Sequence, residues 1–583
     1  MRFRPDRSPA CDGVACNRAR TGASKDGHGS LHQGHPPTIT PVRRTHPRHH
    51  PTIGHVEIDA LIAALRDPVA FPPPHGARVD VAQTHASAVF LVGDSAWKVK
   101  KPVNLGFLDF STLELRRADC ERELRLNRRM VPEIYRGLAA VVRRDGMLRM
   151  VRNPTAGDEL VEWAVEMRRL PAHGMLDRLI PAGGVTAGHL EDVARRLAAF
   201  HDAADHGPSV CVHGAVDILR HRQADCLDRL AAHATHPAAC SPAVLPAAFV
   251  AALDRRARTW LDRLAPLLEE RRAAGRVRDG HGDLQAANTC MLDGRIEAYD
   301  CLEFRDEYRC TDRVMDASFL AMDLDRFGRA DLAESFLAAY AAASDERGID
   351  ELTRFFRMHF AVVRAMTESI RLHQPETPAD QRGTVASKVR AYAQLAAGYA
   401  VDPATVLVMG LPATGKSTLA AHLARAMRAT VISSDVVRKS MHGLHPTDRA
   451  GPVAYSREST DATYRELARQ AAAAVGSVVI DASQRTRAQR APLVAAATAR
   501  GSRWILVDVH ADRATIEARM TRRGQDTHRV SDADLAVHDA LRAEAEPPKE
   551  LPQAHRMQQW SLDEHGSLDR AALEVLGGLL GQA

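Results

Sequence analysis

The chain of 583 residues has no long apolar run, few aromatic residues and little lysine. No stretch approaches the roughly 20 apolar residues of a membrane-spanning helix, and no apolar signal-peptide core is present, so we expect a cytoplasmic protein without membrane association. Nine cysteines, an odd number spread over a long chain, do not form the pattern of a disulfide framework. The net charge of +5 is small for this length and gives no support for nucleic-acid binding.

Lysine is so scarce that its positions are informative. Only eight of the 78 basic residues are lysine. Three of them cluster at Lys98, Lys100 and Lys101, and another is Lys416. A compact ammonium reaches phosphate oxygens in geometries that a planar guanidinium does not. These positions therefore indicate candidate phosphate-binding sites.

Composition and apolar spacing divide the chain into four segments. Residues 1–52 are rich in Arg, His, Pro, Gly and Ser, and we expect a disordered basic tail, with a nucleic-acid-binding arm as the functional alternative. Residues 53–372 begin with strand-like runs, including a hairpin around Gly93, and continue as helices, which predicts an α+β domain. Residues 373–402 are expected to be a linker and connecting helix. In residues 403–583 strands alternate with helices, which predicts a three-layer α/β domain with a parallel sheet.

One group of polar residues has the spacing of a phosphotransferase catalytic loop. Asp283 follows His281 by two positions, Asn288 follows Asp283 by five, and Asp300 comes after a strand-like run. Phosphoryl transfer needs a base that orients the acceptor, metal ligands, and positive charge on the nucleotide phosphates. Asp283 fits the base, and Asn288 and Asp300 offer the oxygen ligands that Mg²⁺ prefers. The alternative is a solvated loop with incidental charges.

A second group is a complete P-loop, placed between an apolar strand and an apolar helix. Backbone amides of such a loop bind phosphate, Lys416 reaches the β- and γ-phosphate oxygens of ATP, and Ser417 coordinates Mg²⁺. The nucleotide-binding residues are Gly410, Leu411, Pro412, Ala413, Thr414, Gly415, Lys416 and Ser417, followed by Thr418.

Five further polar residues follow this loop at the ends of later elements. Asp481 ends the third apolar strand and is a candidate carboxylate acting on Mg²⁺ through water. Asp435 follows the second strand, with Arg438 three positions later. Arg519 and Arg523 lie four apart on one helical face and suit a lid that stabilises the transferred charge. The alternatives are a helix cap for Asp435 and a solvated basic helix end for the last two arginines.

The loop His281–Asn288 resembles the catalytic loop of aminoglycoside phosphotransferases and choline-kinase-like enzymes. This resemblance implies a two-lobe, protein-kinase-like domain in which Lys98 binds the phosphates and pairs with Glu123. Lys100 lies on the same strand face as Lys98 and is a rival, as Glu121 is for Glu123. No glycine-rich loop precedes Lys98, which favours a small-molecule kinase over a protein kinase.

The pattern Asp435-x-x-Arg438 resembles the acceptor site of phage-type polynucleotide kinases and is similar to gluconate-kinase-like and zeta-toxin-like enzymes. There Asp435 would accept the proton of the acceptor hydroxyl and Arg438 would hold an anionic group. Most of the chain resembles bacterial two-domain proteins that join an aminoglycoside-phosphotransferase-like domain to a P-loop kinase domain.

The two resemblances together imply an ATP-binding, Mg²⁺-dependent bifunctional phosphotransferase that acts on hydroxyl groups of small molecules at two ATP sites. The first alternative is a nucleotide-sensing regulatory ATPase with a non-catalytic kinase-like domain. The second is a polynucleotide 5′-end kinase or repair factor. The sequence indicates neither the acceptor of either domain nor the oligomeric state.

Overall fold

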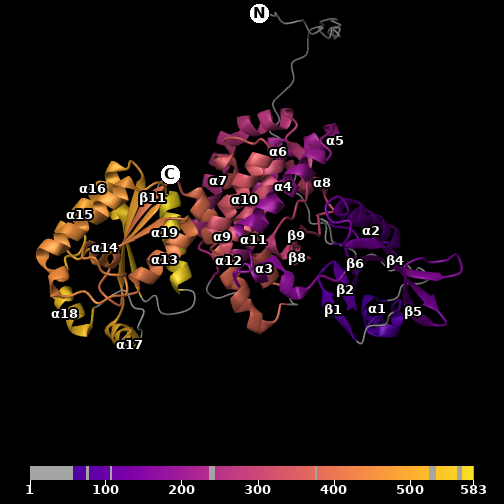
Figure 1. The fold of residues 1–583 in the computed structure, drawn as a ribbon, viewed down its shortest axis with the longest axis horizontal. Helices are drawn as coiled ribbons and strands as arrows, with labels where there is room; N and C mark the ends of the chain where they lie inside the picture. The colour runs from indigo at the N-terminus through magenta and orange to yellow at the C-terminus, as the bar shows by residue number, and fades with distance from the viewer. Residues whose placement is uncertain are drawn as a thin grey trace, which may run out of the picture. The chain divides into compact units, whose positions relative to one another are not determined.

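A computed structural model of the chain describes residues 57–73, 78–104, 108–235, 243–374, 377–523, 533–560 and 567–581. The expected basic tail, residues 1–52, lies outside these ranges. Val56–Ala583 forms one compact unit (Figure 1). Among the described helices, none has both the length and the apolar character that a membrane crossing requires.

The first part of this unit is an antiparallel sheet with one long helix against it. Phe71, Phe90 and Trp97 pack together under one face of the sheet. Helix α2 (Leu113–Asn127) starts at the cap residue Thr112 and covers the other face. In spatial order the strands are β1 (Val79–Gln83), β2 (Ser87–Val92), β3 (Ser95–Lys100), β6 (Glu159–Arg168), β4 (Tyr135–Arg144) and β5 (Met147–Val151).

A helical lobe follows, and it contains two short hairpin-like strand pairs. The catalytic-loop sequence leads through a 3₁₀ turn over Ala286–Asn288 into the antiparallel pair β8 (Thr289–Leu292) and β9 (Arg295–Ala298). β7 (Val277–Asp279) pairs with β10 (Cys310–Asp312) just before and after this region. The main helices are α4 (Ala187–Ala203), α6 (Val216–Ala234), α7 (Ala247–Ala273), α9 (Arg313–Arg326), α10 (Ala330–Ala343) and α11 (Asp350–Leu372).

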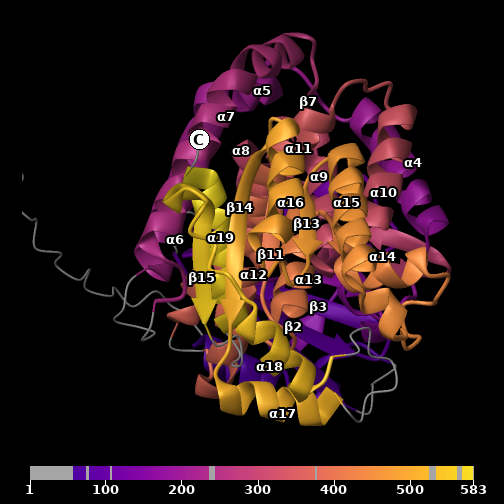
Figure 2. The same ribbon diagram turned by 90° about the vertical axis from the view of Figure 1, so that its left-hand side faces the viewer.

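The last part is a parallel five-stranded sheet with helices on both faces (Figure 2). Its spatial order is β12 (Thr430–Ser433), β13 (Val478–Asp481), β11 (Ala404–Met409), β14 (Arg503–His510) and β15 (Arg556–Trp560). Every residue of β11 is buried, as expected for the central strand of a covered parallel sheet. The helices are α13 (Lys416–Met427), α14 (Ser434–Met441), α15 (Arg457–Ala473), α16 (Arg487–Ala499), α17 (Arg513–Arg523), α18 (Leu535–Ala543) and α19 (Ser567–Gly581). The expected fold class, a two-lobe α+β part followed by a parallel α/β part, is confirmed.

The segment between the helical lobe and the parallel sheet is mostly helix. Helix α12 (Ala379–Ala400) packs against α11, α13 and α19. At Gly398 a Cβ atom would lie 1.8 Å from the carbonyl oxygen of Ala426, so only glycine permits this approach of α12 to α13. One hydrophobic core therefore runs from Phe355 in α11 to Leu576 in α19 without interruption.

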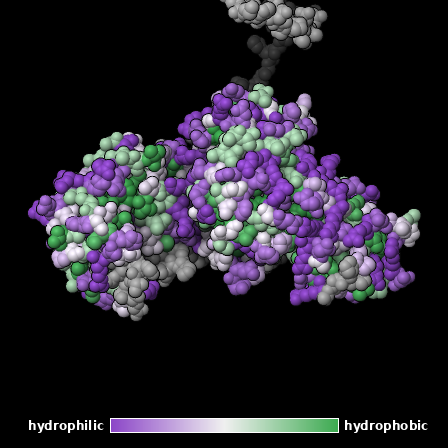
Figure 3. Space-filling view, in the orientation of Figure 1, coloured by the Kyte–Doolittle hydropathy of each residue, from purple (hydrophilic) through white to green (hydrophobic). Residues whose placement is uncertain are grey.

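Several of the large hydrophobic side chains that are exposed among the described residues lie close together in the chain, at Val431, Val436, Met441, Val453 and Tyr455. Hydrophilic side chains are spread over the face shown in Figure 3, with apolar side chains between them.

Candidate functional site

Lys98 is the point at which three distant segments of the kinase-like part meet. Its Nζ atom lies 2.9 Å from Glu123 Oε1 in α2 and 2.8 Å from Asp300 Oδ1 after β9. Asp300 has a left-handed backbone (φ 60°), a conformation that Asp tolerates better than most residues. Its N–H donates to the Tyr135 hydroxyl at 3.1 Å. The carboxyl group of Asp300 is thereby held beside the lysine, with 41% of the side chain exposed.

Lys100, the rival of Lys98, is enclosed by carboxylates instead of facing open space. Its ammonium lies 2.8 Å from Asp119, 2.7 Å from Glu123 and 2.6 Å from Glu303. The side chain of Lys100 is 2% exposed. Glu123 thus contacts both lysines, one with each carboxylate oxygen. The other rival, Glu121, is exposed and pairs with Arg117 on its own helix.

The carboxylate of Asp283 accepts hydrogen bonds from two side chains of its own loop. Gln285 Nε2 donates to both of its carboxylate oxygens at 3.0 Å, and Asn288 Nδ2 donates to one at 2.7 Å. Burial raises the pKa of the Asp283 carboxyl to about 6, against the lowering effect of Arg364. Asp283 is therefore mostly ionised at neutral pH and still basic enough to take a proton.

Helix α9 holds the backbone of this loop in place. Asp316 accepts the N–H groups of His281 at 2.6 Å and Gly282 at 2.9 Å, and Asp323 accepts the N–H of Ala286 at 2.9 Å. Both aspartates are buried. Local motif spacing gives no signal for Asp323, because its partner lies 37 positions away in the chain.

The P-loop has the backbone conformation that its glycines and small residues permit. Gly410 (φ 153°) would clash as any other residue, since a Cβ would lie 2.6 Å from the carbonyl oxygen of Val509. Ala413 and Gly415 are also in the positive-φ region, at 64° and 102°. Helix α13 then begins at Lys416, whose side chain is buried. Successive amides of such a turn, together with a helix N-terminus, form an anion-binding site.

Two residues from later elements support the P-loop from outside. Arg519 Nη1 donates to the carbonyl oxygen of Ala413 at 2.9 Å. The Nδ1 atom of buried His538 lies 2.9 Å from the carbonyl oxygen of Pro412. Arg519 was expected to act in a lid, and it lies next to the loop. His538 was not anticipated, because a single histidine on a helix carries no sequence signal. The side chain of Arg523 lies outside the part of the chain that the structure describes.

Three candidate residues lie at the ends of two neighbouring strands of the sheet. Asp481 is the last residue of β13, and Asp435 and Arg438 follow β12. Asp481 ends β13 beside Val408 of β11, and its Oδ1 atom is buried without a hydrogen-bond partner among the described residues. Asp435 is in the first turn of α14. Arg438 is buried, and its Nη1 atom donates to the carbonyl oxygen of Ala454 at 2.7 Å. Its Nε atom is one of the described buried atoms without a hydrogen-bond partner.

The donor sets fit the divalent ion that the motifs imply. The Asp481 oxygen that has no hydrogen-bond partner among the described residues is buried at the end of β13, the strand next to β11, which leads into the P-loop. A hydrated Mg²⁺ at this place would supply the missing partner. At the other site, Asn288 and the partly exposed Asp300 offer hard oxygen ligands. Both sets are thus chemically suited to Mg²⁺.

Comparisons with known proteins match both parts of the chain. The family model described as "AAA domain" matches residues 406–548. A Mycobacterium tuberculosis protein named "Uncharacterized protein Rv2004c" is 35% identical over 415 residues, covering 69% of this chain and 78% of its own.

Solved structures similar to the chain include two kinases. A choline/ethanolamine kinase family protein from Mesorhizobium loti is 13% identical with a TM-score of 0.36, covering 64% of this chain and 100% of its own. A gluconokinase from Sinorhizobium meliloti is 20% identical with a TM-score of 0.23, covering 31% and 94%.

Proposed function

We propose that this chain, which belongs to the same family as the mycobacterial protein Rv2004c, is an ATP-dependent phosphotransferase with two nucleotide sites that acts on hydroxyl groups of small molecules. The observation that carries the proposal is the contact of Lys98 with both Glu123 and Asp300, at 2.9 and 2.8 Å. A lysine on a sheet, a glutamate on a helix and an aspartate 202 positions from the lysine come together beside an intact catalytic loop. Such a set supports phosphate binding and catalysis more readily than a purely structural role.

At the first site the acceptor hydroxyl gives its proton to Asp283 as its oxygen attacks the γ-phosphorus of ATP. The bond from that phosphorus to the β,γ-bridging oxygen breaks, and ADP leaves with the bond electrons. Lys98 holds phosphate oxygens, and Glu123, which Lys100 also contacts, fixes its position. Asn288 and Asp300 would hold Mg²⁺, which when bound neutralises charge on the phosphates. The raised pKa of Asp283, about 6, suits proton acceptance near neutral pH.

At the second site the P-loop amides and Lys416 bind the ATP phosphates, while Ser417 and Asp481 would hold the second Mg²⁺. Asp435 accepts the proton of the acceptor hydroxyl, and Arg438, three positions later on α14, binds an anionic part of the acceptor. Arg519 and Arg523, on helix α17, stabilise the charge of the transferred group.

A purely nucleotide-sensing role for the kinase-like part is less well supported. A nucleotide sensor needs Lys98 to bind the phosphates, but it does not need a catalytic base. Here Asp283 keeps two hydrogen-bond donors, Gln285 and Asn288, aimed at its carboxylate. This arrangement favours a catalytic site.

The proposal is tested by measuring ADP release across a library of sugars, amino alcohols and nucleosides. Asp283→Ala should abolish turnover of one subset of acceptors and Lys416→Ala turnover of another, and the double variant should be inactive. Asp380→Ala and Lys388→Ala, at exposed positions on α12, are matched controls and should retain full turnover. If neither single variant loses turnover of any acceptor, the assignment of two phosphotransferase sites is wrong.

A further inference from the structure

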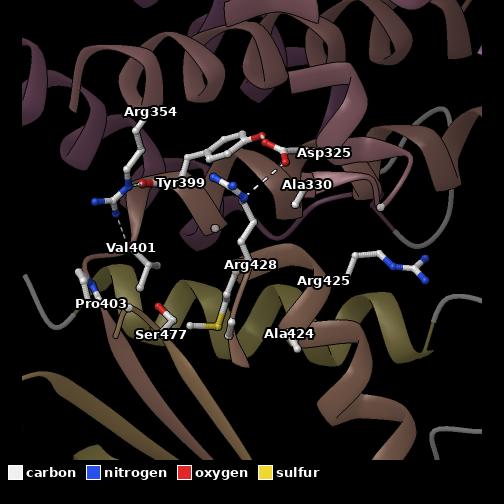
Figure 4. A pocket seen from close by; sticks show the side chains of 15 residues that line it. Asp325, Ala330, Arg354, Tyr399, Val401, Pro403, Ala424, Arg425, Arg428 and Ser477 are labelled. Carbon is white, nitrogen blue, oxygen red and sulfur yellow. Dashed lines mark hydrogen bonds and ion pairs between the residues drawn. The ribbon is translucent and has the colours of Figure 1, made fainter. Parts of the chain in front are cut away.

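A cavity of about 650 Å³ lies where helices α9, α12 and α13 meet (Figure 4). Its described lining includes no residue of the two candidate nucleotide sites. Asp325 and Arg354 come from the helical lobe, Tyr399 from α12, and Arg425 and Arg428 from the end of the P-loop helix. The volume is within the range of small-molecule sites, about 300–1,000 Å³.

The charged residues of this cavity are unbalanced. Three arginines, Arg354, Arg425 and Arg428, face a single acidic residue, Asp325, and the rest of the described lining is uncharged. These lining residues therefore carry a formal excess of two positive charges, although one of the three arginines, Arg428, also pairs with Glu334 outside the lining. Such an excess in a partly enclosed space attracts an anion.

Arg354 is held by backbone oxygens at the end of α12. Its guanidinium donates to two backbone carbonyl oxygens, that of Tyr399 at 2.7 Å and that of Val401 (Figure 4). Burial lowers the pKa of Arg354, and Arg256 and Arg357 act in the same direction against the opposing effect of Asp402. Burial and the two neighbouring arginines thus disfavour the positive charge of Arg354. A bound anion would favour that charge.

Arg428 occupies a backbone position that favours glycine. It follows the last residue of α13 with φ 52°, in the left-handed region where helices commonly end on glycine or asparagine. Its side chain turns into the cavity, where Nε lies 3.3 Å from Asp325 Oδ1 (Figure 4). Another nitrogen of the same guanidinium pairs with Glu334. An arginine in this strained position is explained by what its side chain does in the cavity.

Arg425 completes the set at the other side of the cavity. It is exposed, one turn before the end of α13, and its Nε atom lies 3.9 Å from the position that a Cβ on Gly328 would take. An exposed guanidinium at this place can turn toward a ligand without breaking the packing of α13.

We propose that this cavity binds a small phosphate-bearing anion, separately from the two nucleotide sites. Arginine side chains bind phosphate through paired, charge-assisted hydrogen bonds, and three of them line this cavity, from both parts of the chain. The site does not depend on phosphoryl transfer, so its test and the test of the proposed function can fail independently.

The test uses full-length protein carrying Lys98→Ala and Lys416→Ala, which weakens phosphate binding at both nucleotide sites. Inorganic pyrophosphate is titrated into this background by isothermal calorimetry at physiological salt, with citrate as a carboxylate probe. We expect one pyrophosphate site, with citrate binding more weakly. Adding Arg425→Glu should weaken pyrophosphate binding at least about tenfold, because charge reversal replaces attraction by repulsion.

Two further variants make the result specific to the cavity. Arg428→Gly removes a guanidinium and places the residue that suits a left-handed backbone, so this protein should fold while binding pyrophosphate more weakly. Arg382→Glu makes the same charge reversal as Arg425→Glu on the exposed side of α12 and should leave the affinity within about twofold. The proposal is overturned if the background protein binds no pyrophosphate at millimolar concentration. It is also overturned if the Arg425 and Arg428 variants bind as tightly as the background, or if citrate binds as well as pyrophosphate.

Discussion

Replacing Lys100 by methionine should destabilise the sheet of the kinase-like part more than any comparable change at Lys98. Lys100 lies 2.8, 2.7 and 2.6 Å from the carboxylates of Asp119, Glu123 and Glu303, and its side chain is 2% exposed. Without its ammonium, the buried carboxylates of Asp119 and Glu303 would lose the cation that they contact, and Glu123 would keep only Lys98. Removing one partner of a buried ion pair typically costs about 3–5 kcal/mol, and we expect a loss in this range.

Lys98→Met provides the comparison within the same cluster. Lys98 contacts Glu123, which Lys100 still neutralises, and Asp300, whose side chain is 41% exposed and can be hydrated. Its loss should lower the free energy of unfolding by only about 1 kcal/mol, as for a partly solvated pair. On the proposed function, binding of ATP at the first site should be lost in this variant, because that proposal assigns phosphate binding to Lys98.

The pH dependence of the Lys100 variant adds a second signature. Burial raises the pKa of Glu303 to about 7 from its ordinary value of 4.5, even with Lys100 present. A carboxyl whose pKa is raised by folding favours the folded state when protonated, and this contribution is lost as the pH rises through about 7. Loss of Lys100 raises that pKa further, so the variant should be closer to the parent at pH 6 than at pH 8.

Urea unfolding followed by tryptophan fluorescence and circular dichroism, at pH 6 and pH 8, measures both effects. The reasoning is refuted if Lys100→Met unfolds within about 0.5 kcal/mol of the parent at pH 8, a difference typical of surface substitutions. It is equally refuted if Lys98→Met proves the less stable of the two.

Three further changes test other features of the structure. Gln285→Leu removes the amide that donates to both oxygens of Asp283, so the acidic limb of the pH–rate profile at the first site should move upward from about 6, while Lys416-dependent turnover keeps its profile. Gly398→Ala should lower the free energy of unfolding by more than about 3 kcal/mol, measured by thermal and urea denaturation, because the methyl group meets the helix backbone at 1.8 Å. His538→Ala should raise the KM for ATP at the P-loop site several-fold with an unchanged circular dichroism spectrum, since it removes a contact to that loop.

The local motifs predict the backbone geometry of much of the candidate site, because that geometry depends on neighbours in the chain. The P-loop, the start of α13 at Lys416 and the alternation of strands and helices after residue 403 follow from short-range spacing and apolar periodicity. The catalytic loop has the same character, since Asp283 and Asn288 belong to one turn.

Features that depend on distant partners were beyond such reasoning. Lys98 and Lys100 point to the same face of β3, and only the positions of Asp119 and Glu303 separate the one enclosed by acids from the one beside Asp300. The segment expected to be a linker and connecting helix is largely α12, whose small residues look unremarkable until other helices bury them. Strand β15 also escaped prediction, because its sequence is polar and its pairing with β14 lies at the edge of the sheet.

The contacts of helix α9 determine whether the chain can be divided into two independent fragments. Asp316 and Asp323 fasten one stretch of the helix to the first loop's backbone, and Asp325, near its end, ties it to Arg428 and to Tyr399. A split after residue 402 would separate Asp325 from Arg428, and α12 from α13 and α19. The two fragments should consequently need each other as co-expressed partners, and neither should behave as a portable module for fusion to other proteins.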